Sequence, residues 1–222
     1  MKIDILTLFP DMFSGPFQES IVKRAVENKQ LELSVHNLRN WTTDNYKTVD
    51  DHPYGGGPGM VMRVDIIDKA VTDLKEQNPQ LKPTIILMDT KGQIYTQKKA
   101  VEVAQKEYVI LIAGHYEGID HRVHEHVADE VISIGQYVLT GGEIPAMVVV
   151  DSVSRLLPGV INPDSLTEES YSPSENTVQV NLEYPQYTRP QEYKGWKVPE
   201  ILLSGNHHEI EKWRQEKTKE LA

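Results

Sequence analysis

The strongest constraint on the fold of this chain is an alternation of short apolar runs with helical stretches between residues 3 and 157. Runs rich in β-forming residues predict buried strands at Ile3–Leu8, Leu31–His36, Thr84–Met88, Tyr108–Ile112 and Glu130–Ile134. Apolar residues at helical spacing predict helices at Ser20–Asn28, Val64–Leu74, Gln97–Gln105, Asp120–Val127 and Glu143–Leu157. Because strands that alternate with helices pair in parallel through helical crossovers, we predict an α/β domain with a parallel sheet at residues 1–161.

The remainder of the chain predicts a linker followed by a small second domain. Residues 162–188 contain three prolines, five acidic residues and no Lys or Arg, which is typical of an acidic interdomain linker. Helical spacing returns in residues 189–222, where Asn206 and Glu209 resemble a capping box at the start of an amphipathic helix. We predict a small helical domain in this last segment.

Composition narrows the class of protein. The formal charge of −10 argues against indiscriminate nucleic-acid binding, so an RNA ligand would need a local basic surface. The absence of cysteine excludes disulfides and thiolate metal sites. The N-terminus lacks the pattern of a signal peptide, and the longest apolar run, Ile144–Val150, is too short to span a bilayer. We expect a soluble, cytoplasmic protein that does not associate with a membrane.

Glycine-bearing loops follow three successive predicted strands, at Asp89–Gly92, Gly114–Gly118 and Ile134–Gly142. In an open α/β sheet, ligands bind beyond the carboxyl ends of the strands, and glycine lets the backbone approach a ligand closely. One such loop would merely close a tight turn, but three of them favour a shared pocket. Dinucleotide, P-loop and nucleophile-elbow patterns are absent from the sequence. Glycine spacing by itself leaves nucleotide, phosphate and methyl donor open as ligands.

A fourth segment, Val49–Met62, is rich in glycine and has no strand or helix pattern. Long irregular segments inside a compact domain are uncommon unless they form a lid or a binding loop. A flexible surface excursion would explain the glycines but not Tyr54, Met60 and Met62. We therefore predict a functional loop at these residues.

Three histidines, His121, His124 and His126, lie close together in the sequence and suggest a metal site. Only two of them share a helical face, and no carboxylate stands at the spacing of a known zinc motif. We predict a solvated helix face at this position and no metal site.

Taken in order, a set of long motifs resembles the bacterial tRNA (guanine-N1)-methyltransferase family of the SPOUT superfamily. The motifs run nearly from end to end of the chain: Lys2–Pro10, Val49–Asp51, Pro53–Met60, Gly114–Asp120, Ser133–Gly135, Tyr137–Glu143, Arg155–Val160, Tyr187–Pro190 and Leu203–His207.

The resemblance implies a C-terminal trefoil knot in the α/β domain, formed by the glycine loops, and a homodimer whose active site lies between subunits. It implies S-adenosylmethionine as methyl donor, with Mg²⁺ associated with the family although no ligand cluster in the sequence demands it. The implied reaction methylates N1 of guanosine at tRNA position 37, next to the anticodon. By the same resemblance, the donor would contact Thr90, Gly92, Gly114, Tyr116, Glu117, Gly118, Ile134, Gly135, Gln136, Tyr137, Val138, Leu139, Gly141 and Gly142.

The resemblance also implies two catalytic residues. Guanine N1 carries a proton at neutral pH, so methyl transfer requires a general base, and charge that develops on O6 requires a hydrogen-bond donor. Arg155 matches the family's catalytic arginine, and Glu169 stands where the family usually has an aspartate as base. Gln136 likewise stands where an acid is common. These departures leave two alternatives: an RNA-binding protein that has lost turnover, and a knotted methyltransferase that acts on another RNA site.

Overall fold

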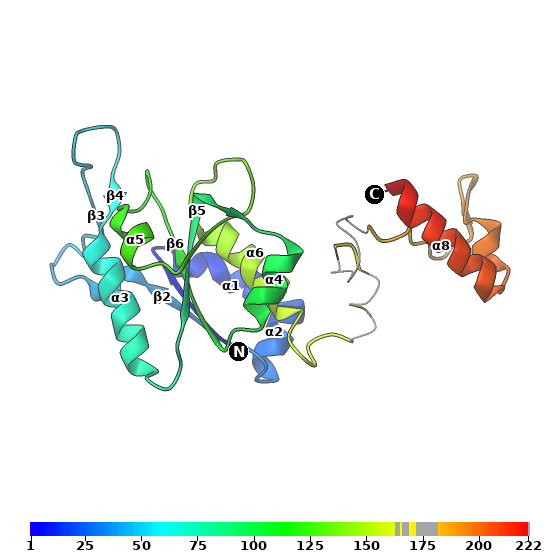
Figure 1. Cartoon of the computed structure of the whole chain (residues 1–222), viewed down its shortest axis with the longest axis horizontal. Helices are drawn as coiled ribbons and strands as arrows, with labels where there is room; N and C mark the ends of the chain where they lie inside the picture. The colour runs from blue at the N-terminus through cyan, green and yellow to red at the C-terminus, as the bar shows by residue number, and fades with distance from the viewer. Residues whose placement is uncertain (163–164, 166–168, 172–181, 222) are drawn as a thin grey trace. The chain divides into compact units, whose positions relative to one another are not determined.

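The structure of the protein is a computed structural model that describes residues 1–162, 165, 169–171 and 182–221. For residues 219–221 it describes the backbone alone. The chain divides into two compact units, residues 1–161 and residues 162–222, which we describe separately (Figure 1). Every helix within the described ranges is too short or too polar to cross a membrane.

The first unit is built on a five-stranded sheet in the order β2-β1-β6-β5-β7. All neighbouring strands pair in parallel, as the alternating pattern predicted. The strands are β1 (Lys2–Thr7), β2 (Glu32–Asn37), β5 (Thr84–Ile94), β6 (Tyr108–Ala113) and β7 (Glu130–Ser133). Because the strands are parallel, their carboxyl ends share one edge of the sheet, the upper edge in Figure 1.

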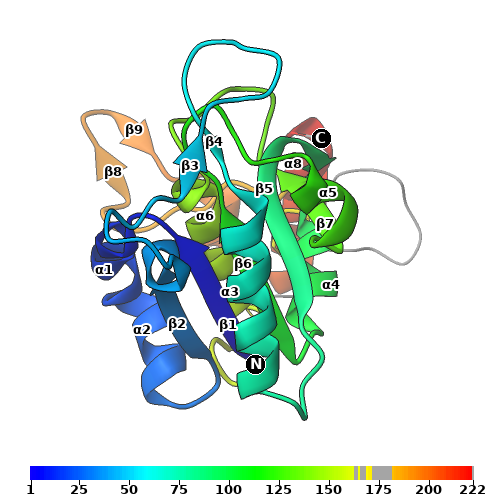
Figure 2. The same ribbon diagram turned by 90° about the vertical axis from the view of Figure 1, so that its left-hand side faces the viewer.

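Helices cover both faces of this sheet, which gives three layers (Figures 1 and 2). Side chains alternate along each strand, so Ile86 and Met88 join one buried cluster and Ile85 and Leu87 join the other. The first cluster lies under α1 (Ser14–Phe17), α2 (Ser20–Glu27), α4 (Gln97–Ala104), α6 (Glu143–Ser154) and the 3₁₀ turn η1 (Pro10–Phe13). The second lies under α3 (Val64–Gln77), α5 (Arg122–His126) and the turn η2 (Leu38–Trp41).

Strand β5 is longer than predicted and contains the segment Asp89–Gly92, which we had expected to be a loop. Met88 and Gln93 both pair with Ile132 of β7, so the intervening residues form a bulge and β5 resumes pairing beyond it. A Cβ atom on Gly92 would lie 2.5 Å from the backbone nitrogen of Ile132, so glycine permits this close passage. The residues of the bulge are polar or glycine, so the sequence carries no strand pattern there and predicts a loop.

The segment Val49–Met62, predicted to have no regular structure, starts and ends in a short antiparallel pair. Strand β3 (Asp50–Asp51) pairs with β4 (Val61–Met62), and the glycine-rich residues form the loop between them. Figure 2 shows this loop above the carboxyl edge of the sheet. Two-residue strands are too short to leave a period-2 pattern, which explains why the prediction missed them.

A buried polar cluster is centred on Asp4 of β1, whose exposure is 1%. His36 Nε2 lies 2.7 Å from one carboxylate oxygen of Asp4, and the hydroxyl of Tyr108 donates a 2.7 Å hydrogen bond to the other. Burial opposes ionisation of Asp4, but the hydrogen bonds from His36 and Tyr108 outweigh it and lower the pKa of the carboxyl group. Burial, followed by the bond to Asp4, raises the pKa of Tyr108.

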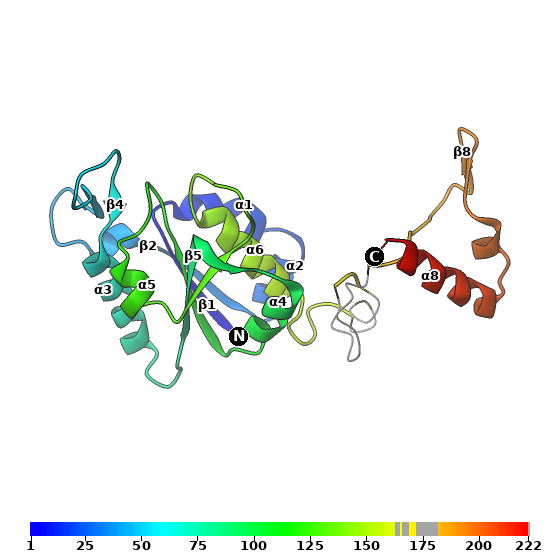
Figure 3. The same cartoon turned by 45° about the horizontal axis from the view of Figure 1, so that its top comes forward.

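The second unit contains a helix, as predicted, and also a hairpin that the sequence patterns did not indicate. The hairpin joins β8 (Glu192–Tyr193) to β9 (Trp196–Lys197), and the turn η3 (Glu200–Leu203) leads to α8 (His207–Leu221) (Figure 3). The backbone nitrogen of Glu209 donates to the side chain of Asn206 at 3.4 Å, in keeping with the predicted cap.

Candidate functional site

A cavity of about 360 Å³ opens in the first unit where β5, β6 and β7 end. Most of its wall comes from three segments: Met88–Lys91 of β5, Gly114–Ile119 after β6, and the end of β7 with the residues that follow it. Val61 of β4 and Pro145 of α6 complete the lining. This is the edge at which open α/β sheets bind ligands, and the volume falls within the range of small-molecule sites. The glycine segments singled out in the sequence therefore meet around one cavity.

Nearly all of the residues predicted to contact the donor line this cavity. They are Thr90, Gly114, Tyr116, Glu117, Gly118, Ile134, Gly135, Tyr137, Val138, Leu139, Gly141 and Gly142. Gly92 and Gln136 are not among the lining residues. Gly92 instead packs against the backbone of Val131 and Ile132 in β7, and its lack of a side chain permits this contact.

The loops that follow β6 and β7 touch each other directly. The backbone nitrogen of Gly142 donates a 2.7 Å hydrogen bond to the carbonyl of Gly114. A Cβ atom on Gly142 would lie 2.7 Å from the nitrogen of Gly114, so a larger residue would push the two loops apart. The backbone of Tyr116, within the loop that follows β6, adopts φ +61°, which is unusual for a residue with a side chain. Such backbone strain is frequent at ligand sites.

A buried carboxyl group, that of Glu143, lies next to a residue that lines the cavity. Glu143, in the first turn of α6, is 1% exposed and accepts a 2.8 Å hydrogen bond from the hydroxyl of Thr7. The second oxygen of Glu143 lies 3.7 Å from Nδ1 of His115, a cavity-lining residue. The ring of His115 also packs against Phe9, at 4.7 Å between centroids. Neither Glu143 nor His115 was predicted as a site residue, although both lie inside the motifs singled out above.

The loop between β3 and β4 is anchored to the wall of the cavity. Met62 and Glu117 each take part in this anchor: the nitrogen of Met62 donates to the carbonyl of Gly118, and the nitrogen of Glu117 donates to the carbonyl of Met60. At the tip of the loop, Tyr54 is fully exposed. The base of the loop is thus ordered by the cavity wall while its tip faces solvent, an arrangement compatible with the predicted lid or binding loop.

The three clustered histidines do not form a solvated face, and that expectation is wrong for His124. Its side chain is 8% exposed and its Nε2 atom lies 3.1 Å from Oδ2 of Asp89, a cavity-lining residue. Only His121 and His126 are exposed. The apolar residue Val123, which precedes His124 in the sequence and is buried in the structure, was the available signal that this part of α5 packs against the core. Among the described residues, no group of three or more His, Asp or Glu side chains is placed to hold a metal ion.

The two predicted catalytic residues belong to different units of the chain, and Arg155 is not among the residues that line the cavity. Arg155 follows the last turn of α6 and is half-buried, whereas the start of the same helix adjoins the cavity. Glu169 belongs to the second unit and is also half-buried. Both residues make interactions within the protein.

Comparison with known proteins extends the motif resemblance over the whole chain. The family model described as "tRNA (Guanine-1)-methyltransferase TrmD" matches residues 1–222. A tRNA (guanine-N(1)-)-methyltransferase from Listeria welshimeri is 50% identical over 219 residues, which make up 98% of this chain and 87% of that relative. Proteins of the same name from Bacillus cereus and Bacillus anthracis are 51% identical over 219 residues, with the same coverage.

Proposed function

The chain belongs to the tRNA (guanine-1)-methyltransferase family, and on that premise we propose that it methylates N1 of guanosine 37 in tRNA, with S-adenosylmethionine as methyl donor. The protein is accordingly a methyltransferase that modifies guanine in tRNA. The observation that carries the assignment of the donor site is the cavity at the carboxyl ends of β5, β6 and β7, which collects residues from three family motifs.

The cavity suits a nucleoside-like donor because five glycines line it, and glycine leaves backbone polar groups accessible. Residues Ile134–Gly135 and Tyr137–Leu139 present N–H and C=O groups that could pair with the edge of an adenine ring. A Cβ atom on Gly114 would lie 3.0 Å from Cδ1 of Ile119, and Gly118 adopts φ +138°, so both positions of this loop favour glycine. When bound, the donor supplies a methyl group on a sulfonium, which is electrophilic and needs no metal for activation.

The chemistry at guanine would fall to Glu169 and Arg155. Guanine N1 is a poor nucleophile until its proton leaves, and we assign Glu169 as the base that takes this proton. Negative charge then develops on O6, and the guanidinium of Arg155 would donate hydrogen bonds to that oxygen. Glu169 is one methylene longer than an aspartate, which changes its reach but not its capacity to act as a base. The guanine must leave its stack to reach these groups.

We also propose that the residues after Met88 form the trefoil knot of the SPOUT fold. The bulge of β5 carries the chain past Ile132 so that residues on both sides of the bulge pair with the same strand. The segment after β7 then returns to hydrogen-bond with Gly114 at the end of β6. A trefoil knot requires one segment of the chain to pass through a loop formed by another, and these two contacts bring the segments concerned together.

A homodimer accounts for two features of α6. The first is its outer face: Ile144 and Val148 are 47% and 39% exposed, although the opposite face of the helix is buried in the core. Exposed apolar side chains one helical turn apart are typical of a surface that another chain covers. The second is its length: α6 separates the cavity edge from Arg155 by 12 residues, which is about 18 Å of helix. In a dimer, Arg155 and Glu169 of one subunit could serve the cavity of the other.

The test is transfer of a labelled methyl group to tRNA transcripts that differ only in guanosine or adenosine at position 37, with and without Mg²⁺. We expect incorporation only into the guanosine transcript, at N1. Glu169→Gln should abolish most turnover while leaving donor binding intact, and Glu200→Gln, an exposed acid of the same unit, is the matched control. Binding of tRNA without any incorporation would support a protein that has lost turnover, and incorporation at another nucleotide would support a different RNA site.

A further inference from the structure

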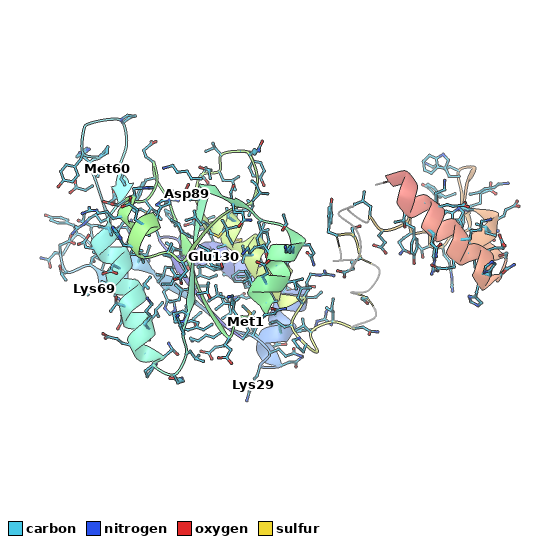
Figure 4. The ribbon with its side chains drawn as sticks, viewed as in Figure 1. Met1, Lys29, Met60, Lys69, Asp89 and Glu130 are labelled. Atoms are coloured by element: carbon cyan, nitrogen blue, oxygen red, sulfur yellow. The ribbon has the colours of Figure 1, made fainter. Side chains whose placement is uncertain are left out.

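The side chain of Asp89 is held in a defined orientation at the cavity wall. Its Oδ1 atom accepts a 2.9 Å hydrogen bond from the backbone nitrogen of Lys91, and its Oδ2 atom lies 3.1 Å from Nε2 of His124. The hydroxyl of Thr90 lies 3.5 Å from Oδ1, which is too long for a strong hydrogen bond. The carboxylate therefore has one partner on each oxygen. Figure 4 shows Asp89 towards the upper edge of the first unit, on the same side as Met60.

His124 has an environment that points to Asp89 as its main polar partner. Its side chain is 8% exposed, and its Nδ1 atom is buried without a hydrogen-bond partner within the described residues. The ring of His121 stacks on it at 4.9 Å between centroids. Since Nδ1 has no partner, the contact with Asp89 is the one polar contact of this ring in the part of the chain that the structure describes, and it constrains both side chains.

We propose that Asp89 recognises the ribose of the methyl donor, that its carboxylate accepts hydrogen bonds from the 2′ and 3′ hydroxyls, and that His124 is the positioning residue that fixes this carboxylate. The proposal rests on the assignment of the cavity as the donor site. It adds a recognition contact that neither the motif resemblance nor the family match assigns to these two residues.

The geometry favours neighbouring hydroxyls as the group recognised. An ionised carboxylate has about four acceptor positions, two on each oxygen. With one position on each oxygen already used, one acceptor position remains on each oxygen of this cavity-lining residue. Two adjacent acceptors match two adjacent hydroxyl donors. The donor's ammonium group is the competing candidate, because it too would be attracted to a carboxylate, and the experiment separates the two.

Isothermal titration of the whole 222-residue chain with two ligands provides the test: S-adenosylhomocysteine and its 2′,3′-dideoxy analogue. Wild type should bind the dideoxy analogue roughly ten- to a hundredfold more weakly, as expected for lost hydrogen bonds to a charged group. Asp89→Ala should weaken binding of S-adenosylhomocysteine by a similar factor and bind both ligands equally, because the two changes remove the same contact. Asp89→Asn keeps the shape and one acceptor oxygen but loses the charge, so it should reduce both the affinity and the discrimination, and it replaces the alanine variant if that variant fails to fold.

Variants of His124 test the positioning role. His124→Leu should weaken binding of S-adenosylhomocysteine and reduce discrimination against the dideoxy analogue, while His124→Gln, whose amide nitrogen can reach the position of Nε2, should restore both. His126→Leu, a change on the exposed side of the same helix, is the matched control and should behave as wild type. A merely structural role for His124 would lower the thermal midpoint but leave the discrimination between ligands unchanged.

Two results would overturn the inference alone: wild type that binds both ligands equally, or Asp89→Ala that still discriminates between them. If Asp89→Ala discriminates normally but loses affinity for both ligands, the carboxylate contacts the ammonium group and the ribose assignment is wrong. Wild type that binds neither ligand would overturn the donor site itself, and with it the proposed function.

Discussion

The hydroxyl of Thr7 donates a hydrogen bond of 2.8 Å to the buried carboxyl group of Glu143, and so joins the end of β1 to the start of α6 across 136 residues of sequence. The same hydroxyl oxygen accepts a hydrogen bond from the backbone nitrogen of Phe9. Because the other oxygen of Glu143 faces His115 in the cavity wall, this contact ties the first strand of the sheet to the candidate donor site.

Replacement of Thr7 by valine should destabilise the protein by roughly 1–3 kcal/mol, because it leaves a buried carboxyl oxygen and a backbone N–H without their partner. The free energy of unfolding, measured in urea, gives the comparison with wild type. Thr7→Ser retains the hydroxyl and is the matched control. A valine variant that unfolds at the same urea concentration as wild type would mean that the hydroxyl of Thr7 does not support this junction.

Gly92→Ala should destabilise the first unit by about 1–3 kcal/mol and weaken donor binding, since its methyl group would collide with the backbone of Val131 and Ile132. Gly15→Ala is the control, because nothing lies within 4 Å of a Cβ atom at that position in α1. Urea unfolding and titration with S-adenosylhomocysteine report the two effects separately. If Gly92→Ala behaves like Gly15→Ala in both measurements, the close passage of β5 past β7 does not constrain the site.

The Asp4 cluster should make stability depend on pH in the acid range. The pKa of Asp4 is lowered in the folded protein, so its contribution is fully present above the unfolded value, near 3.8, and is lost as pH falls through the lower folded value. Asp4→Asn should remove this part of the pH dependence and destabilise the protein at neutral pH by on the order of 2 kcal/mol.

The measurement for Asp4 is the urea midpoint between pH 2 and 6, a range that brackets its ordinary pKa. Asp68→Asn, which changes an exposed acid on α3, should leave the profile as in wild type. A profile for Asp4→Asn that overlays wild type throughout the acid range would contradict the role assigned to the cluster.

Val148→Glu should convert the proposed dimer to monomer, because it places a carboxylate in the middle of the exposed apolar face of α6. Sedimentation velocity reports the oligomeric state, and the labelled-methyl assay should show loss of turnover in parallel. Lys98→Glu, a charge change on the exposed side of α4, should affect neither. A wild-type protein that sediments as a monomer while it methylates tRNA would refute the intersubunit site.

Mixing two inactive variants tests the shared active site directly. Gly141→Val should block the cavity, since its side chain would meet Glu143 and His115, and Glu169→Ala removes the proposed base. If each site combines a cavity from one subunit with Glu169 from the other, subunit exchange should restore about a quarter of wild-type turnover in a symmetric dimer. Turnover that stays at the background of the separate variants would mean that one subunit supplies the whole site.

The sequence by itself determined the features that depend on local pattern. Local pattern was enough to predict β1 and β6, which are rich in apolar residues and almost entirely buried, and the amphipathic helices α2 and α3. The order of the glycine motifs was enough to indicate the family, the reaction and most of the cavity wall. These are properties of residues that are close in the sequence, so they can be predicted without the tertiary structure.

Tertiary structure decided what depends on partners distant in the chain. The continuation of β5 past Asp89 exists because β7 lies beside it, and the polar residues of the bulge carry no strand pattern of their own. His124 turned out to be buried because α5 packs with that side towards Asp89, 35 residues earlier in the sequence. The bond from Thr7 to Glu143 likewise spans most of the first unit. Burial and pairing arise only when separated segments meet, so the sequence named the loops of the site but not the contacts that hold them in place.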